Sequence, residues 1–299
     1  MDPASRPAAA PSRRPGHARQ WEDNAGLDPL RAILTREGGA WTEAEFFATG
    51  EEEITRLFAF MGAGGFAPSG RVPFLDFGCG VGRVTLPLAA RLGPGVGVDV
   101  AERMVALARG YAASRAPGVR FVVNRTTDLS ALGPARFDFI YSHLVLHHLT
   151  PRDQLGYLDA LLGALAPGGT AALQTIEPNG RWRPPPLREL VPTQARRLIR
   201  RAVAALRGIP PPPARPVVAM HALAEDRVLA AVAVRGCRIL AAPYSNSAEP
   251  DHRGRVEFFE REEATRRAGA TPFLARFYFV RRPAGRQTPA MNSPTAGSE

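Results

Sequence analysis

Residues 72–83 read VPFLDFGCGVGR, and this stretch decides the fold of the chain. Its first half is an apolar run that predicts a buried strand, and the glycines after it predict a sharp turn into a helix. Glycine has no Cβ, so a ligand can approach the backbone of such a turn closely. The start of the next helix offers free N–H groups and a partial positive charge, which suit a carboxylate or a phosphate.

A carboxylate follows this turn at the end of a second apolar run. Asp99 lies near the end of residues 95–100, where it can accept hydrogen bonds from both hydroxyls of a ribose. A dinucleotide fingerprint, G-x-G-x-x-G, fits poorly because the glycines fall at positions 78, 80 and 82. NAD and FAD are therefore disfavoured. The alternative that Asp99 only caps the following helix stays open.

Apolar runs and helical patterns alternate along most of the chain, which predicts a parallel sheet covered on both faces. We therefore expect an α/β protein with a Rossmann-like, doubly wound, mostly parallel sheet. The expected strands are 72–77, 95–100, 119–123, 137–142, 170–175, 237–242 and 275–281, and the expected helices are 51–61, 83–91, 101–113, 151–166, 193–207 and 222–234.

The two ends of the chain and one internal segment depart from this alternation. Residues 1–20 and 283–299 are polar and are expected to be a disordered leader and tail. The single domain then spans residues 21–282, and residues 21–70 form a helical cap. Residues 177–220 are rich in proline and are expected to be a lid insertion, whose helix packs its apolar face on the domain and turns its arginines toward solvent or ligand.

The charge and the cysteine content indicate where the excess positive charge lies and which cellular compartment suits the protein. The formal net charge is +10, and every basic residue is Arg. Nine Arg and one Glu lie between Arg181 and Pro216, so this segment carries most of the excess charge. Two cysteines, Cys79 and Cys237, cannot form a disulfide framework, which predicts a reducing, cytoplasmic compartment. We expect no transmembrane segment, because no apolar run approaches the roughly 18–20 residues that one needs.

Four stretches, taken in order, resemble the motifs of class I S-adenosylmethionine-dependent methyltransferases of the bacterial small-molecule type. The resemblance covers residues 72–176 well, and it implies S-adenosyl-L-methionine as cofactor. It also implies a seven-stranded sheet whose last strand is antiparallel. The four stretches are the glycine turn at 74–83, residues 96–100 with Met104 after them, residues 137–149, and the turn at 165–170.

The resemblance also implies which residues hold the cofactor. The glycine turn would lie beside the methionine moiety, two carboxylates would hold the ammonium group and the ribose, and the side chains after the second strand would pack on the adenine. The residues of the turn are Gly78, Cys79, Gly80 and Gly82, and the two carboxylates are those of Asp76 and Asp99. The residues that would pack on the adenine are Val100 and Met104. Ser142, at the end of the fourth strand, is a further candidate.

The loop after the third strand departs from the family pattern. Family members often place an acidic residue there for the adenine, whereas this chain has Arg125 at that position. We expect Thr126, Thr127, Asp128 or a backbone carbonyl to replace it.

No catalytic residue follows from the motifs, because transfer of a sulfonium methyl group mainly requires alignment and exclusion of water. A base helps only if the nucleophile starts protonated, and a histidine could then accept the proton. The candidates are His143, His147 and His221, and Glu177 and Tyr244 are possible pocket residues. Ligand spacing for a metal is lacking, so we expect no metal site.

The sequence therefore predicts an enzyme that methylates an oxygen, nitrogen or carbon atom of a small-molecule acceptor. The arginines of residues 177–220 favour an anionic or amphipathic acceptor and leave a membrane surface open as an alternative. Nucleic acid is disfavoured because no recognised binding module accompanies the charge. A nucleic-acid-modifying methyltransferase and a non-catalytic, cofactor-binding regulatory protein are the rival functions, and the oligomeric state stays open.

Overall fold

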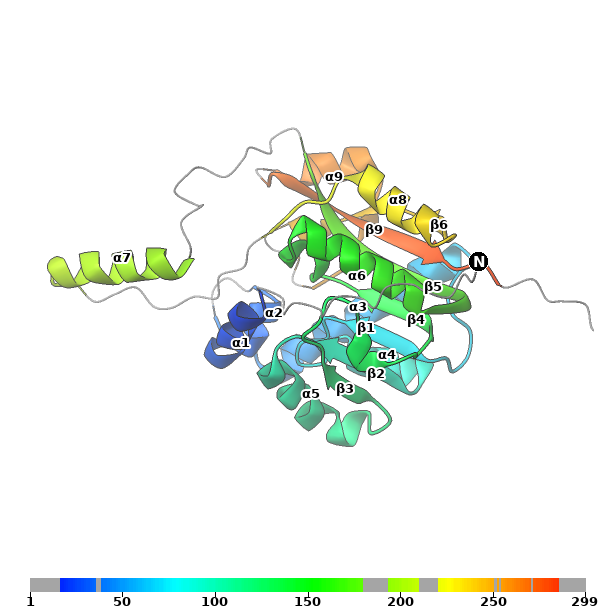
Figure 1. The fold of residues 1–299 in the computed structure, drawn as a ribbon, viewed down its shortest axis with the longest axis horizontal. Coiled ribbons are helices and arrows are strands. Elements are labelled where there is room, and N and C mark those ends of the chain that lie inside the picture. The colour runs from blue at the N-terminus through cyan, green and yellow to red at the C-terminus, as the bar shows by residue number, and fades with distance from the viewer. Residues whose placement is uncertain are drawn as a thin grey trace, which may run out of the picture.

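The computed structural model describes residues 17–35, 39–179, 193–209, 220–249, 252, 254–269 and 271–284. Its centre is a single mixed sheet, with helices packed on both faces (Figure 1). The strands are β1 Phe74–Phe77, β2 Gly95–Asp99, β3 Arg120–Val123, β4 Phe137–Ser142, β5 Leu165–Pro178, β6 Arg238–Ala241, β7 Tyr244–Ser245, β8 Phe258–Phe259 and β9 Phe273–Arg281.

The strand order is β3-β2-β1-β4-β5-β9-β7-β8, and β6 also pairs with β9. The pairs among β1 to β5 are parallel, whereas β9 runs antiparallel to β5 from Thr170↔Arg281 to Pro178↔Phe273. This confirms the predicted mostly parallel α/β sheet with an antiparallel last strand. The predicted count of seven strands is too low, because the described residues form nine. β7 and β8 have two residues each, too few to produce a periodic pattern.

Apolar side chains fill the space between the sheet and the helices on each face. On one face, α6 (Pro151–Ala164) and α8 (Glu225–Val234) pack Leu161 and Val232 against β-strand residues. On the other face, α3 (Glu43–Ala63) and α4 (Thr85–Leu92) contribute Leu57 and Leu88. A densely packed interior resists deformation, so it holds the loops at the carboxyl ends of the strands in place.

The N-terminal helical cap begins earlier than predicted. Helix α1 spans Ala18–Leu27 and therefore overlaps the leader expected at residues 1–20, of which residues 1–16 lie outside the described residues. Helix α2 (Pro29–Ile33) follows, and its Asp28 N-cap accepts a hydrogen bond from the Arg31 N–H at 3.0 Å. Helix α3 begins with a capping box of Thr42 and Glu45, so the helix expected at residues 51–61 is the second half of a longer one.

The expected lid insertion lies partly outside the described residues. β5 continues to Pro178, and within residues 180–219 only residues 193–209 are described. They contain α7 (Thr193–Leu206), which stands apart from the sheet in Figure 1. The expectation that its apolar face packs on the domain is wrong for the described side chains, since Leu198 and Leu206 are 68% and 87% exposed. The helical period correctly predicted an amphipathic helix, but a period does not identify the surface that the apolar face meets.

Candidate functional site

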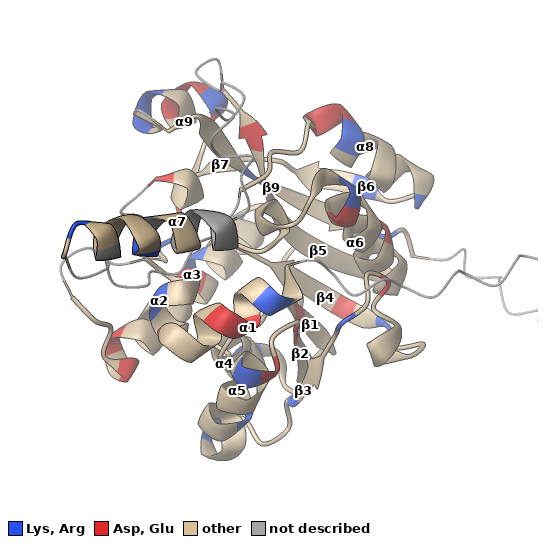
Figure 2. Ribbon diagram, turned by 60° about the vertical axis from the view of Figure 1, so that its left-hand side comes forward, with Lys and Arg blue, Asp and Glu red and all other residues tan. Residues whose placement is uncertain are grey.

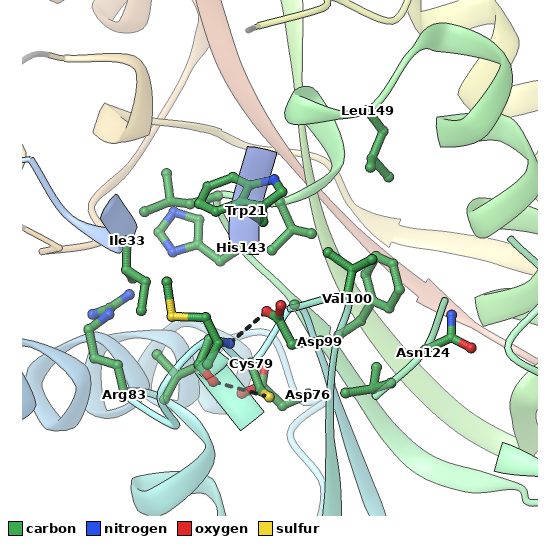
Figure 3. Close-up of a pocket in the computed structure, with 18 of the residues that line it drawn as sticks. Trp21, Ile33, Asp76, Cys79, Arg83, Asp99, Val100, Asn124, His143 and Leu149 are labelled. Atoms are coloured by element: carbon green, nitrogen blue, oxygen red, sulfur yellow. Dashed lines mark hydrogen bonds between the residues drawn. The ribbon is translucent and has the colours of Figure 1, made fainter. Parts of the chain in front are cut away.

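A pocket opens at the carboxyl ends of β1, β2 and β4, beneath helix α1 (Figure 3). β1 lies between β2 and β4, so this is the point where the strand order reverses and where ligands bind in open α/β sheets. Figure 3 shows Arg83 and His143 toward one end of the pocket and Asn124 and Leu149 toward the other. The lining includes eight residues expected from the sequence, namely Asp76, Gly78, Cys79, Gly80, Asp99, Val100, Met104 and His143.

The glycine turn is tied to the second strand by its backbone. The N–H groups of Gly78 and Cys79 both donate to the Val98 carbonyl, at 2.8 and 3.0 Å. Gly80 has a φ of +53°, in the left-handed region that favours glycine. A Cβ at Gly80 would lie 2.6 Å from Ile33 Cδ1, another residue of the pocket lining. Any side chain at Gly80 would therefore crowd the pocket.

Asp99 joins the end of β2 to its neighbouring loops. Its Oδ2 accepts the Gly80 N–H at 2.9 Å, and its Oδ1 accepts the Ala101 N–H at 2.9 Å. Burial raises the pKa of Asp99 above its ordinary value, although these backbone hydrogen bonds oppose the rise. A carboxylate has about four lone-pair sites, so two bonds leave acceptor capacity for a ligand hydroxyl. The capping and ligand interpretations of this residue are thus compatible.

Asp76 is a buried carboxyl group beneath the glycine turn. Its Oδ2 accepts a hydrogen bond from the Thr85 hydroxyl at 2.5 Å. Burial raises the pKa of Asp76 to about 7, although the hydrogen bond from Thr85 opposes this rise. A cation placed beside this carboxyl group would favour its ionised form.

The sequence analysis missed a buried polar network that borders the pocket. Glu53 of α3 is fully buried, and its carboxylate receives three partners. Arg83 Nη2 lies 2.6 Å from Oε2, while the Tyr141 hydroxyl and His143 Nδ1 lie 2.7 and 2.9 Å from Oε1. His143 Nε2 in turn lies 2.7 Å from Ser247 Oγ. Glu53 stands about twenty residues before the first motif, so no local pattern connects it with the site.

This network places an ionised carboxylate beside His143. Burial raises the pKa of Glu53, but attraction from Arg83 and from His143 outweighs burial and brings it to about 2. The ionised carboxylate only accepts hydrogen bonds, so the proton between it and His143 resides on Nδ1. His143 Nε2 faces the hydroxyl of Ser247. Arg83 Nε, in contrast, is buried without a hydrogen-bond partner among the described residues.

The other two candidate histidines lie outside the pocket lining. His147 is buried, with Nδ1 3.2 Å from Gln174 Oε1, and burial lowers its pKa well below the ordinary value. The same Gln174 oxygen accepts the N–H of Leu144, which adopts an uncommon positive φ of 59°. His221 donates its backbone N–H to the His147 carbonyl at 2.7 Å. The His147 side chain is thus held within the packing of this loop, and the backbone of His221 joins the same loop.

Seven further expected residues also lie outside the pocket lining. In the third-strand loop, Thr126 donates its hydroxyl to Asn124 Oδ1 at 3.0 Å, and it is Asn124 that borders the pocket. Asn124 is a polar residue directly after the third strand, and this position in the sequence could have predicted that it borders the pocket. The seven are Gly82, Thr126, Thr127, Asp128, Ser142, Glu177 and Tyr244, of which the last two are hydrogen-bonded to each other. Trp21, Leu149 and Tyr157, in contrast, line the pocket without having been expected from the sequence.

Comparison with known proteins identifies the domain that carries this pocket. Residues 74–169 match the family model described as a methyltransferase domain. A ubiquinone biosynthesis O-methyltransferase of Cereibacter sphaeroides is 37% identical over 106 residues, which are 35% of this chain and 41% of that protein. The chain thus spans less than half the length of the curated relatives that it matches first.

Two solved structures share the fold at low sequence identity. The cyclopropane synthase MmaA2 of Mycobacterium tuberculosis aligns with a TM-score of 0.53 and 15% identity, over 89% of this chain and 99% of that one. Magnesium protoporphyrin IX methyltransferase of Synechocystis, with bound SAM, aligns with a TM-score of 0.51 and 17% identity, over 92% of this chain and 100% of that one. Residues 74–169 are therefore similar to a methyltransferase domain, and the chain shares the fold of these two solved structures.

Proposed function

We propose that this protein is an enzyme that transfers a methyl group from S-adenosyl-L-methionine to a small-molecule acceptor. The observation that carries the proposal is the pocket at the reversal of the strand order, which joins the glycine turn to Asp76 and Asp99. The cofactor, when bound, supplies an electrophilic methyl group on its sulfonium. The protein then has to align the acceptor and exclude water.

The polar and apolar groups of the pocket fit the parts of this cofactor. Asp76 would hold the ammonium group, and the unpartnered Nε–H of Arg83 is a donor for the carboxylate. Asp99 would hold the ribose. The adenine would then lie toward the other end of the pocket, against Val100 and Met104. Gly82, Ser142, Thr126, Thr127 and Asp128 would act indirectly, by shaping the loops around the pocket.

His143 is our candidate for the base, because it alone among the three candidate histidines borders the pocket and has a carboxylate partner. An acceptor hydroxyl that displaced Ser247 Oγ would lie against Nε2 and could give it its proton. Such a base favours a hydroxyl nucleophile, which starts protonated. The similarity to ubiquinone biosynthesis O-methyltransferases supports O-methylation of a small molecule, while N- and C-methylation are the alternatives.

The setting and organisation of the chain form part of the same proposal. No helix among the described residues is long and apolar enough to cross a membrane. Both cysteines are free thiols, which supports a reducing, cytoplasmic location. We place one domain at residues 21–282, with residues 177–220 as an insertion whose arginines favour an anionic or amphipathic acceptor.

A screen of candidate acceptors that reports release of S-adenosylhomocysteine tests this function. Release that depends on one class of small molecule is the expected result, and calorimetry should show binding of S-adenosylhomocysteine. Tight binding without turnover of any acceptor would favour the regulatory alternative. Methylation of RNA or DNA would favour the nucleic-acid alternative, and binding of NADH in place of S-adenosylhomocysteine would refute the cofactor assignment.

A further inference from the structure

Helix α7 and the residues after it present an exposed apolar stripe. Five large apolar side chains are exposed there, with fractions of 68% for Leu198, 58% for Ile199, 40% for Val203, 87% for Leu206 and 54% for Ile209. At about 100° per residue, Leu198, Ile199, Val203 and Leu206 lie along one side of α7, and Ile209 follows the end of the helix. They are half of the ten large apolar side chains that are exposed in the described parts of the chain, so the stripe is a concentrated patch.

Basic side chains lie beside this stripe. Arg201 and Arg207 are exposed, and a rotation of about 100° per residue places them on opposite flanks of the apolar side. Acidic residues are absent from the sequence of α7, and the chain from Arg181 to Pro216 contains nine Arg and one Glu. Figure 2 shows α7 with blue basic positions and no red acidic ones. Apolar and cationic groups therefore share one exposed helix.

A binding partner for this surface has to accept both kinds of group. Two copies of the helix in contact would bring like charges together, which is unfavourable. The surface of an anionic bilayer satisfies both, because phosphate groups accept hydrogen bonds from Arg while apolar side chains enter the boundary of the acyl chains. We infer that α7 is an interfacial helix that binds this protein to an anionic lipid bilayer. The inference does not depend on methyl transfer, since it concerns a surface outside the cofactor pocket.

The position of α7 in the chain gives this surface a connection with the pocket. α7 is the next described element after β5, which runs parallel to β4 and therefore ends at the sheet edge that carries the pocket. Lipid binding through α7 would therefore hold the chain to the membrane through the segment that follows this edge.

Flotation of the full chain with lipid vesicles tests the inference. Vesicles of phosphatidylcholine and phosphatidylglycerol should carry the protein, vesicles of phosphatidylcholine alone should not, and salt should weaken the binding. Replacing Leu198, Ile199 and Leu206 together with Ser should reduce the partition coefficient at least tenfold. The matched control replaces Leu229 and Val234 of α8, which are 42% and 81% exposed, and it should bind like the parent protein.

A second pair of variants tests the charge. Replacing Arg201 and Arg207 with Gln should weaken the binding by roughly fivefold per arginine, from about 1 kcal/mol for each basic residue near an anionic surface. Replacing the exposed Arg152 and Arg238 with Gln is the control of equal charge change. Equal binding to both vesicle types, or equal losses in the α7 variants and their controls, would overturn the inference. A dimer that is lost in the apolar α7 variant without any lipid effect would instead assign the stripe to a second copy.

Discussion

Asp76 makes stability depend on pH through a single buried carboxyl group. Its pKa is about 7 in the folded chain against 3.8 ordinarily, mainly because of burial. The folded state thus holds this proton more tightly than the unfolded state, so the free energy of unfolding falls as pH rises from about 4 through 7. Asp76→Asn should stabilise the protein by roughly 2–4 kcal/mol at pH 8, at about 1.4 kcal/mol per pKa unit, and change little at pH 4.

Urea denaturation at both pH values measures this effect. Asp226→Asn, a change at an exposed carboxylate, is the control and should leave both values close to those of the parent protein. A stabilisation of Asp76→Asn that is the same at pH 4 and pH 8 would contradict the assignment of the proton to Asp76.

Glu53 and His143 give a second prediction at the scale of residues, which rests on the proposed function. Glu53→Gln removes the charge that holds the proton on Nδ1, so kcat should fall by roughly 100-fold while KM changes little, at the lower end of the usual range for general base catalysis. His143→Gln should abolish the limb of the pH–rate profile that reports the base. His147→Gln is the control and should keep that limb.

A melting curve separates these effects from loss of folding, because Glu53→Gln also leaves Arg83 without its buried carboxylate. If folded Glu53→Gln keeps the parent kcat and pH profile, Glu53 has only a structural role.

Gly80 tests the pocket itself. Gly80→Val should abolish binding of S-adenosylhomocysteine, because its Cβ would crowd Ile33 in the pocket and its φ is positive, while the circular dichroism spectrum is retained. Gly70 also has a positive φ, +74°, but no atom lies within 4 Å of its added Cβ. Gly70→Val is therefore the control for backbone strain alone. Unchanged cofactor affinity in Gly80→Val would show that this turn does not border the ligand.

At the scale of elements, α1 covers the pocket that the sheet forms. Trp21 of α1 lines the pocket, and its ring centroid lies 5.3 Å from that of His148. The chain has three tryptophans, so Trp41→Phe with Trp182→Phe leaves Trp21 as the single reporter. Addition of S-adenosylhomocysteine should then shift the Trp21 emission with saturation. A further Trp21→Phe change should remove the signal, and an unchanged emission at saturating ligand would place α1 away from the cofactor.

At the scale of the whole molecule, ligand binding should stabilise the fold by mass action. A ligand at a hundred times its Kd adds about 2.7 kcal/mol to the free energy of unfolding. Asp99→Ala should weaken the binding of S-adenosylhomocysteine by about 1.5–3 kcal/mol, the range for hydrogen bonds to a charged group, and so lose most of the thermal shift. Asp226→Ala should keep it. An equal thermal shift in both variants would remove Asp99 from the site.

The sequence by itself determined the sheet of this protein and the edge of the sheet that carries the pocket. The parallel strands alternate with helices, and their apolar runs are long enough for hydrophobic periodicity to predict them. The glycine turn and Asp99 each follow an apolar strand directly, so the pairing of β1 with β2 brings them to the same edge of the sheet. The same reasoning failed for β7 and β8, which are too short for a pattern, and for the third-strand loop, where Asn124 borders the pocket in place of Thr126.

The tertiary structure decided which polar groups meet. Glu53 on α3, His143 after β4 and Ser247 near β7 come from three separate parts of the chain, and only the packing of α3 and the last strands on the sheet brings them together. Burial then sets their protonation, because the pKa of a carboxyl group depends on solvent exclusion and nearby charges, which are properties of the folded arrangement. For the same reason, the helical period predicted the apolar side of α7, whereas its exposure to solvent became evident only in three dimensions.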